Sequence, residues 1–233
     1  FIPGHEWAGE IVALGEKAES FGWKIGDRVA GTSHAGCGFC RMCTTGRYNL
    51  CDNYGNTDIH RQYGHYTHGS FADYQVTSIK SIHRMPDEMS FDEGSMVDGV
   101  SIALHSAKRG NINAGDNVVI FGPGPLGLMA FQCAFALGAA RVFVVGRRER
   151  LQKAKEMGAE VIDIEKVDPV KAIMDITNGL GVEVTIDCTG TKECTLQSLE
   201  IARKNANVVF TGIPKQPVEL PMRKIVLEEV NIF

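Results

Sequence analysis

The pattern of apolar and polar residues changes between about residues 105 and 116. Before this point, short apolar runs punctuated by glycines predict strands at 10–14, 28–30 and 71–76, typical of a small β-rich domain. After it, apolar strand-like runs alternate with helical stretches. We expect strands at 118–121, 142–145, 161–164, 184–187, 208–211 and 225–232, and helices at 126–137, 149–157 and 192–203. This alternation predicts an α/β domain with a doubly wound parallel sheet.

The junction between the two patterns is rich in turn residues. Gly110 and the run Asn113-Ala114-Gly115-Asp116 supply them. We therefore predict a β-rich domain at 1–108 and an α/β domain at 109–233.

Composition and charge narrow the function classes. The 233 residues carry a net charge of −4 and are 44% hydrophobic, which is typical of a globular protein and argues against partners such as nucleic acid or anionic lipid. Residues 117–140 carry no charge, but Gly122-Pro123-Gly124-Pro125 interrupts them, so no membrane span is expected. With no targeting signal visible, we expect a cytoplasmic protein. The start at Phe1 and the apolar end at Phe233 suggest a fragment that lacks both ends of a longer protein.

Four of the seven cysteines lie within one glycine-bearing loop. They have the spacing C-x2-C-x2-C-x7-C, at Cys37, Cys40, Cys43 and Cys51. Four thiolates on a short loop suit a tetrahedral zinc ion that has no open position, which indicates a structural site. The alternatives are an iron–sulfur cluster or two disulfides; the odd cysteine total disfavours the disulfides. We call residues 37–51 the cysteine lobe.

A glycine-rich turn follows the first strand of the second pattern. Its G-x-G-x-x-G sequence stands between an expected strand and an expected helix and comprises Gly122, Gly124, Pro125, Leu126 and Gly127 with Pro123. Gly122 permits a tight turn, Gly124 lets the backbone approach a pyrophosphate, and Gly127 allows close helix–strand packing. The alternative is a glycine turn without a ligand. In the dinucleotide interpretation, the helix N-terminus faces the phosphates.

The residues that end the next strand bear on the choice of coenzyme. An NAD-preferring site has an acidic residue about 20 positions after the glycine turn, but this sequence has Gly146-Arg147-Arg148. Without the acid there is room for a 2′-phosphate, which guanidinium groups bind well. We therefore predict NADP(H) in preference to NAD(H). Alternatively, both arginines are a solvated helix start and Glu149 is a displaced acid.

Together, these motifs reveal a resemblance to a known family. The order Gly4-His5-Glu6-x-x-Gly9, cysteine lobe, G-x-G-x-x-G resembles the zinc-dependent medium-chain alcohol/polyol dehydrogenases over essentially the whole chain. The resemblance implies a GroES-like catalytic domain, with its zinc lobe, joined to a Rossmann domain. It also implies two zinc ions, one structural and one catalytic, and makes His5 a catalytic zinc ligand. The family's ligand cysteine and its proton relay would precede Phe1.

The resemblance gives the remaining catalytic ligands as carboxylates. Asp98 resembles the ligand that polyol dehydrogenases supply as Glu and bacterial secondary-alcohol dehydrogenases as Asp. Glu6 would be a direct ligand or a carboxylate that exchanges with it. Asp98 could instead be an N-cap of the helix expected at 100–107. We expect His60, His65 and His68 to be loop and strand-edge residues.

The function implied is hydride transfer between a nicotinamide cofactor and a secondary alcohol, polyol or amino alcohol, or the matching ketone. Residues 28–51, with His34, also resemble threonine dehydrogenases. Thr189, Gly212 and Ile213 follow two expected strands and are predicted to contact the cofactor. The family usually forms homodimers or homotetramers. The alternatives are a zinc-independent quinone-type reductase of the same superfamily and a non-enzymatic zinc module that binds nucleic acid.

Overall fold

The computed structural model describes all residues from Phe1 to Phe233, and their contacts divide the chain into two units. Unit 1 comprises Phe1–Gly99 and unit 2 comprises Val100–Phe233. The division falls near the start of helix α3 (Val97–Arg109), earlier than the boundary expected after residue 108. No helix in either unit has the length and apolar character needed to cross a membrane.

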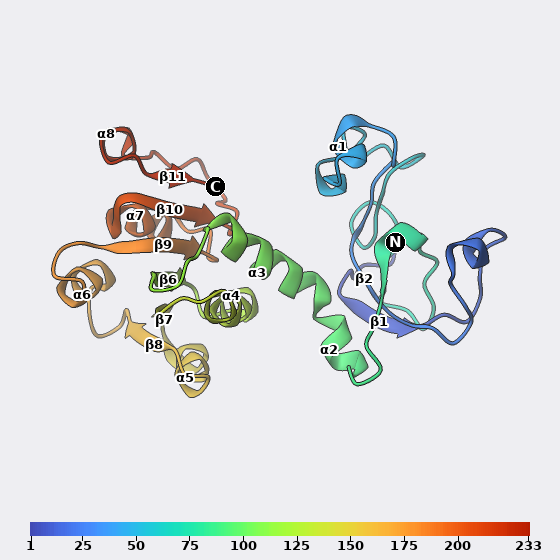
Figure 1. Cartoon of the computed structure of the whole chain (residues 1–233), viewed down its shortest axis with the longest axis horizontal. Helices are drawn as coiled ribbons and strands as arrows, with labels where there is room; N and C mark the ends of the chain where they lie inside the picture. Colours follow the sequence, from blue (N-terminus) through green and yellow to red (C-terminus); the bar gives the residue numbers. More distant parts are fainter. The chain divides into compact units, whose positions relative to one another are not determined.

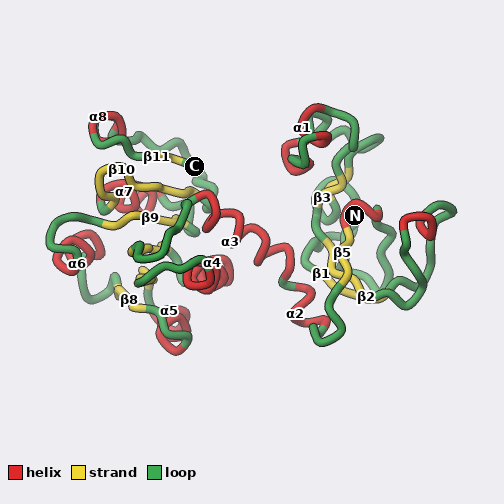
Figure 2. The backbone as a smooth tube through the Cα atoms, in the orientation of Figure 1, coloured by secondary structure: helices red, strands yellow, loops and turns green.

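Unit 1 is built from short strands and long connections, as Figure 2 shows. Strands β1 (Trp7–Glu10), β2 (Arg28–Gly31) and β5 (Ile82–Arg84) form an antiparallel sheet in the order β1-β2-β5. Strands β3 (His34–Ala35) and β4 (Arg61–Gln62) form a separate antiparallel pair. The remaining elements are the short helices η1 (Ala18–Phe21), α1 (Arg41–Thr44), η2 (Tyr48–Leu50), η3 (Ile79–Ser81) and α2 (Phe91–Ser95).

Two of the strands expected in unit 1 are wrong. The first strand occupies residues 7–10 and not 10–14, because its pairing with β2 runs from Trp7 opposite Gly31 to Glu10 opposite Arg28 and then closes through the Ile11 N–H and Asp27 carbonyl. Residues 71–76 form no strand. The backbone N–H groups of residues 73–77 have no hydrogen-bond partner, and Val76 is 94% exposed. An apolar run becomes a strand only where a neighbour pairs with it.

Unit 2 is the predicted doubly wound α/β domain (Figure 1). Its six strands are all parallel, in the order β11-β10-β9-β6-β7-β8. They are β6 (Asn117–Phe121), β7 (Arg141–Gly146), β8 (Glu160–Asp163), β9 (Val182–Asp187), β10 (Ala202–Phe210) and β11 (Asn231–Ile232). The helices are α4 (Pro125–Ala136), α5 (Arg148–Glu156), α6 (Pro169–Ile176), α7 (Lys192–Glu200) and α8 (Met222–Leu227).

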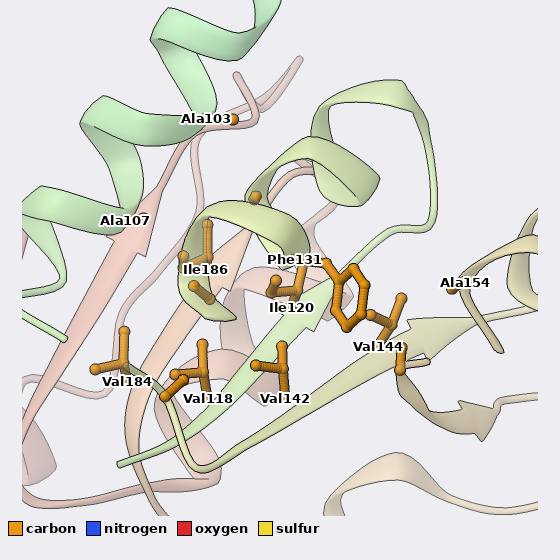
Figure 3. Close-up of a cluster of buried hydrophobic side chains, with 14 of the residues drawn as sticks. Ala103, Ala107, Val118, Ile120, Phe131, Val142, Val144, Ala154, Val184 and Ile186 are labelled. Atoms are coloured by element: carbon orange, nitrogen blue, oxygen red, sulfur yellow. The ribbon is translucent and has the colours of Figure 1, made fainter. Parts of the chain in front are cut away.

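Alternate residues of the central strands form two apolar layers, one on each face of this sheet. Val118, Ile120, Val142, Val144, Val184 and Ile186 pack with α3, α4 and α5, as Figure 3 shows for Ala103, Ala107, Phe131 and Ala154. Val119, Phe121, Phe143 and Val145 point to the opposite face, where Ile173 of α6 and Cys194 of α7 contact them. Because side chains alternate along a strand, runs without polar residues require helices on both faces.

The end of unit 2 differs from the strand expected at 225–232. Residues 222–227 form α8, and only Asn231 and Ile232 form a strand. Ile225 packs against a buried cluster with Val208 and Val230, whereas Val226 and Leu227 are 66% and 67% exposed. Burial on one side of the segment is typical of a helix. In the sequence, a short apolar run such as this one is compatible with either a helix or a strand.

Candidate metal and coenzyme sites

The cysteine lobe brings its four thiols together around helix α1 and the 3-10 helix η2. The Sγ atoms of Cys37, Cys40, Cys43 and Cys51 all lie within 4.8 Å of one another. The pairs Cys37–Cys43 and Cys40–Cys51 are each 3.9 Å apart, too far for a disulfide bond. Tetrahedral zinc with Zn–S bonds of about 2.3 Å would separate its sulfurs by about 3.8 Å. The spacing therefore fits the predicted zinc ion.

Amide groups around the thiols favour their ionised form. The Cys40 N–H and the Asn53 side-chain amide donate to Cys37 Sγ, and the N–H groups of Cys43 and Asp52 donate to Cys40 Sγ, all at 3.4 Å. Burial opposes ionisation of Cys37, but the Phe39 N–H, the Asn53 amide and the Cys40 N–H outweigh it and lower the Cys37 pKa to about 6. Burial and the neighbouring thiols raise the pKa of Cys43 to about 12. Binding of zinc at these thiols would therefore require loss of the Cys43 proton.

The lobe is attached to the rest of unit 1 by polar contacts. Lys80 Nζ lies 3.3 Å from the carbonyl oxygens of both Gly36 and Cys37. The lobe has little apolar packing of its own, since Phe39 is 66% exposed and Leu50 is 55% exposed. A metal ion at the thiols would be its main internal contact.

Three glycines fix the backbone on which His5 is carried. A Cβ atom on Gly64 or Gly69 would lie 2.2 Å or 2.0 Å from the Gly4 carbonyl oxygen, so the three backbones are in direct contact. Gly4 itself has φ +98°, a conformation that favours glycine. The Ser70 N–H donates to the same carbonyl oxygen. His5 therefore has a defined position although it precedes the first strand.

Asp98 meets His5 from the start of helix α3. His5 Nε2 lies 3.7 Å from Asp98 Oδ2, and the Ser33 N–H donates to Asp98 Oδ1 at 3.3 Å. The carboxylate is buried, with the residue 7% exposed. Asp98 is the second residue of α3, within its first turn, so the alternative of a cap ahead of the helix is wrong. Glu6 is exposed, and its carboxylate forms no hydrogen bond or ion pair.

The other histidines of unit 1 lie in loops or short strands, but two of them are closer to His5 and Asp98 than the sequence suggests. The His65 ring centroid is 4.6 Å from that of His5. Burial, followed by the charge of His60, lowers the pKa of His34, while Asp98 acts in the opposite direction. His60 is 1% exposed and packs on Tyr54, and its Nε2 has no hydrogen-bond partner. The signal for this cluster is the density of histidines at 60–68. The Nδ1 atom of His68 accepts from the Ile2 N–H.

A cleft of about 1350 Å³ opens at the carboxyl ends of β6, β7 and β9 in unit 2. The glycine turn forms one wall, with Gly122, Pro123 and Gly124. Gly122 has φ +97°, and a Cβ on Gly127 would lie 1.9 Å from the Gly122 carbonyl oxygen, so both positions require glycine. A Cβ on Gly124 would meet only Arg150 Nη1, at 3.9 Å, which leaves its backbone accessible from the cleft. Pro125, Leu126 and Gly127 form the first turn of α4. This turn has the open backbone needed to hold a pyrophosphate.

Gly146, Arg147 and Arg148 line the same cleft, but the two arginines differ in their contacts. Arg148 Nε donates to Glu165 Oε1 at 3.2 Å, and Arg148 has φ +61°. The Arg147 guanidinium forms no hydrogen bond or ion pair. Glu149 also lines the cleft and makes no ion pair. Arg150, which follows Arg148 by two positions and belongs to none of the predicted sites, also lines the cleft beside Gly124.

A buried carboxylate shapes the wall formed by the end of β9. Asp187 is 0% exposed; its Oδ1 accepts from the N–H and hydroxyl groups of Thr189 and from the Gly190 N–H, and its Oδ2 accepts from the Thr195 hydroxyl. Thr189 lines the cleft. Gly212 and Ile213 are not among the lining residues: Gly212 packs against this turn, where its Cβ would lie 2.1 Å from the Gly190 N, and Ile213 is 90% exposed.

Sequence comparisons match both units. The alcohol dehydrogenase GroES-like domain matches residues 1–87, and the zinc-binding dehydrogenase domain matches residues 125–233. The chain is 35% identical to a sorbitol dehydrogenase of Halalkalibacterium halodurans, covering 98% of this chain and 66% of that protein. It is 32% identical to an L-threonine 3-dehydrogenase of Colwellia psychrerythraea, covering 99% of this chain and 66% of that protein.

Comparison with solved structures gives the same result. A Sinorhizobium meliloti protein described as a zinc-binding dehydrogenase, solved bound to NADP, matches with a TM-score of 0.90 and 30% identity, over 99% of this chain and 67% of that one. The chain belongs to the zinc-dependent medium-chain alcohol/polyol dehydrogenase family. It spans about two thirds of the length of its curated relatives, at 66%. The resemblance and the fold class predicted from the sequence, a GroES-like unit with a Rossmann unit, are therefore confirmed.

Proposed function

We propose that the full-length protein is a zinc-dependent oxidoreductase that transfers a hydride between a nicotinamide coenzyme and a secondary alcohol, polyol or amino alcohol, or the matching ketone. The observation that carries this proposal is the cleft at the glycine turn, which has the open backbone and strand-end position of a dinucleotide site. Relatives named sorbitol dehydrogenase and L-threonine 3-dehydrogenase support this substrate class. The particular alcohol depends on residues lining the substrate site of the whole protein.

His5 and Asp98 are the proposed ligands of a catalytic zinc ion. Their side chains converge at 3.7 Å, one nitrogen and one oxygen donor, and Ser33 holds the second carboxylate oxygen. Bound zinc would supply Lewis-acid chemistry toward the substrate oxygen, and the nicotinamide would carry the hydride. Glu6 remains a proposed direct ligand or exchanging carboxylate; its exposed side chain has no partner that would hold it away from a bound metal ion.

The four thiols of the cysteine lobe are the proposed ligands of a second, structural zinc ion. All four ligands would be cysteine thiolates of the protein, so a tetrahedral zinc ion would have no open coordination position for a substrate. We infer that its role is to order residues 37–51. The proposed content of the full-length protein is therefore two zinc ions per chain.

We propose that the coenzyme is NADP(H) in preference to NAD(H). No carboxylate stands at Gly146, and the unpaired Arg147 guanidinium is available for a 2′-phosphate in the cleft. The Arg148 guanidinium already pairs with the Glu165 carboxylate, so Arg147 is the stronger candidate for binding the 2′-phosphate. The NADP found in the Sinorhizobium meliloti protein supports this choice. Titrating the protein with NADPH and NADH by fluorescence tests it, and equal affinities would contradict the preference.

Replacement of His5 tests the proposed catalytic site. In the full-length protein we expect His5→Ala to reduce the zinc content from two ions to one and to abolish alcohol-dependent reduction of NADP. The fold and coenzyme affinity should be retained, because the cysteine lobe and the cleft do not involve His5. His83→Ala is the control, since His83 is exposed on β5. Unchanged zinc content and turnover in His5→Ala would refute the assignment.

Oligomeric state and location stay predictions. We propose a homodimer or homotetramer, as is usual for the family, and a cytoplasmic protein. Light scattering of the full-length protein measures the first, and cell fractionation measures the second.

A further inference from the structure

The proline of the glycine turn lies against the glycine that ends β7. Strands β6 and β7 are neighbours, and the Gly122 N–H donates to the Val145 carbonyl oxygen, which brings Pro123 over Gly146. A Cβ atom on Gly146 would lie 2.3 Å from Pro123 Cδ and 2.4 Å from Pro123 Cγ. Real Cβ atoms do not approach other atoms so closely. Any side chain at position 146 therefore requires the proline ring to move.

The three heavy atoms nearest a Cβ at this position all belong to the proline ring. Gly146 does not have a positive φ, so its backbone conformation is open to other residues. Its carbonyl oxygen accepts from the Ile164 N–H, a bond that does not depend on the side chain. The distance from the same Cβ to Pro123 Cβ is 3.6 Å, an ordinary van der Waals contact. An alanine at 123 would keep only that Cβ and would leave room at 146.

The position of this glycine gives the contact its functional meaning. A carboxylate at the end of the second strand of such a sheet binds the ribose hydroxyls of NAD and repels a 2′-phosphate. We propose that Pro123 is a specificity-determining residue, because its ring excludes every side chain, and so every carboxylate, from position 146. The ring thereby keeps this side of the cleft open for the 2′-phosphate that Arg147 would bind. This inference rests on the proposed coenzyme function.

A double-mutant cycle separates the steric part of the proposal from the coenzyme part. The full-length wild type is compared with Gly146→Ala, Pro123→Ala and the double variant by thermal unfolding. We expect Gly146→Ala alone to lower Tm by several degrees, because overpacking against a rigid ring destabilises. In the Pro123→Ala background the same change should be close to neutral. An equal effect of Gly146→Ala in both backgrounds would overturn the steric exclusion, whatever the coenzyme.

The second arm uses Gly146→Asp with and without Pro123→Ala, and measures Kd for NADPH and NADH by fluorescence titration. Pro123→Ala alone should still prefer NADPH, since position 146 still lacks a carboxylate. Pro123→Ala/Gly146→Asp should shift the ratio of affinities toward NADH by about tenfold or more, the effect of one charge-assisted contact. Gly146→Asp alone should bind both coenzymes weakly or fail to fold.

The outcomes distinguish this inference from the function on which it rests. If Gly146→Asp alone is as stable as the double variant and shifts the preference as far, the ring does not control position 146 and the inference fails. If the double variant is stable but its coenzyme ratio equals that of the wild type, the specificity role of Pro123 is refuted although the steric contact exists. A wild type without NADPH preference refutes the proposed coenzyme instead, while the thermal cycle still reports on the ring.

Discussion

Buried apolar side chains are abundant in unit 2 and sparse in unit 1. All three clusters of buried apolar residues lie in unit 2, where they line both faces of the parallel sheet. In unit 1, buried apolar residues such as Val29, Ile82 and Met85 are few and lie in or next to short strands. Unit 1 has instead a convergent set of thiols, three glycine backbones in contact, and polar ties such as Lys80. Unit 2 is therefore held together by an apolar core, whereas unit 1 contains a loop whose thiols are placed so that they could bind a metal ion.

Because of this difference, the cysteine lobe should be sensitive to loss of a metal ligand, whereas the sheet of unit 2 should be sensitive to loss of apolar volume. A metal clip can order a segment too small for a core, with apparent binding energies of about 10–16 kcal/mol in small zinc modules. A buried sheet instead loses stability in proportion to the apolar volume removed. Substitutions in the two units should therefore have effects that differ in kind as well as in size.

The largest effect is expected from removal of a lobe thiol. Cys40→Ser in the full-length protein should abolish binding of the proposed structural zinc ion and leave residues 37–51 unfolded, because Cys40 also accepts two backbone N–H groups at its sulfur. Zinc per chain and hydrogen exchange in the lobe measure this. Exchange in unit 2 should be unchanged, and Cys133→Ser is the matched control. A lobe that remains protected without metal would show that unit 1 does not need the clip.

Truncation of the central strand should have the next largest effect. Ile120 is 0% exposed and packs in the cluster of Figure 3, so Ile120→Ala should cost about 2–5 kcal/mol of unfolding free energy. Chemical denaturation checks the value, and zinc content should be unaffected. Val226→Ala is the control, because Val226 is 66% exposed. A cost below about 1 kcal/mol would mean that the sheet of unit 2 depends less on packing than its burial indicates.

The arginines at the end of β7 should have smaller effects, confined to the coenzyme. Arg147→Ala should weaken NADPH binding about tenfold or more, since a charge-assisted hydrogen bond contributes about 1.5–3 kcal/mol. NADH binding should change little. Arg223→Ala, an exposed arginine on α8, is the control. Equal losses for both coenzymes would show that Arg147 does not contact the 2′-phosphate.

Glu165 should act in the opposite direction from Arg147. Its carboxylate holds Arg148 and lies on the same cleft. Glu165→Gln would release that guanidinium and remove a negative charge near the proposed phosphate position. We expect tighter NADPH binding, by a few fold, with NADH nearly unchanged in the same titration. Weaker NADPH binding would mean that Arg148 needs its partner to be held in place.

The smallest effect is expected from an exposed ion pair. Arg141 donates to both oxygens of Glu160, at 2.7 Å and 2.6 Å, and its hydrogen bond lowers the pKa of Glu160. Because the folded-state pKa lies below the unfolded one, the stabilisation is complete above the unfolded pKa and is lost as pH falls through the folded pKa. Glu160→Gln should cost about 0.2–1 kcal/mol at pH 7, and the difference should shrink in acid. Glu156→Gln, from a longer pair, serves as control in the same denaturation series.

The sequence predicted the parts of the fold whose causes are local. The strands of unit 2 that carry continuous apolar runs lie where expected, since burial on both faces leaves a direct trace in the sequence. The strand predicted at 71–76 is wrong because a strand needs a neighbour to pair with. The strand predicted at 225–232 is largely wrong because a short apolar run fits a helix as well as a strand.

In the candidate sites, too, features with local causes could be predicted and contacts between distant residues could not. The spacing of the cysteines predicts a convergence that the structure contains. The contact of His65 with His5, the ion pair of Arg148 with Glu165, and the exclusion of side chains at Gly146 by Pro123 each join residues distant in the chain. No local pattern encodes such contacts, because they arise only when the strands and loops that carry them become neighbours.

The buried carboxylate of Asp187 has a consequence for how tightly a ligand can be held. Its two oxygens accept from four donors in the turn that follows β9 and in α7, so this wall of the cleft is already ordered when the sheet forms. The conformational entropy of that turn is therefore lost during folding and not during binding. A ligand that meets a wall set in advance retains more of its contact energy as affinity, and dissociates more slowly, than one that must order the wall itself.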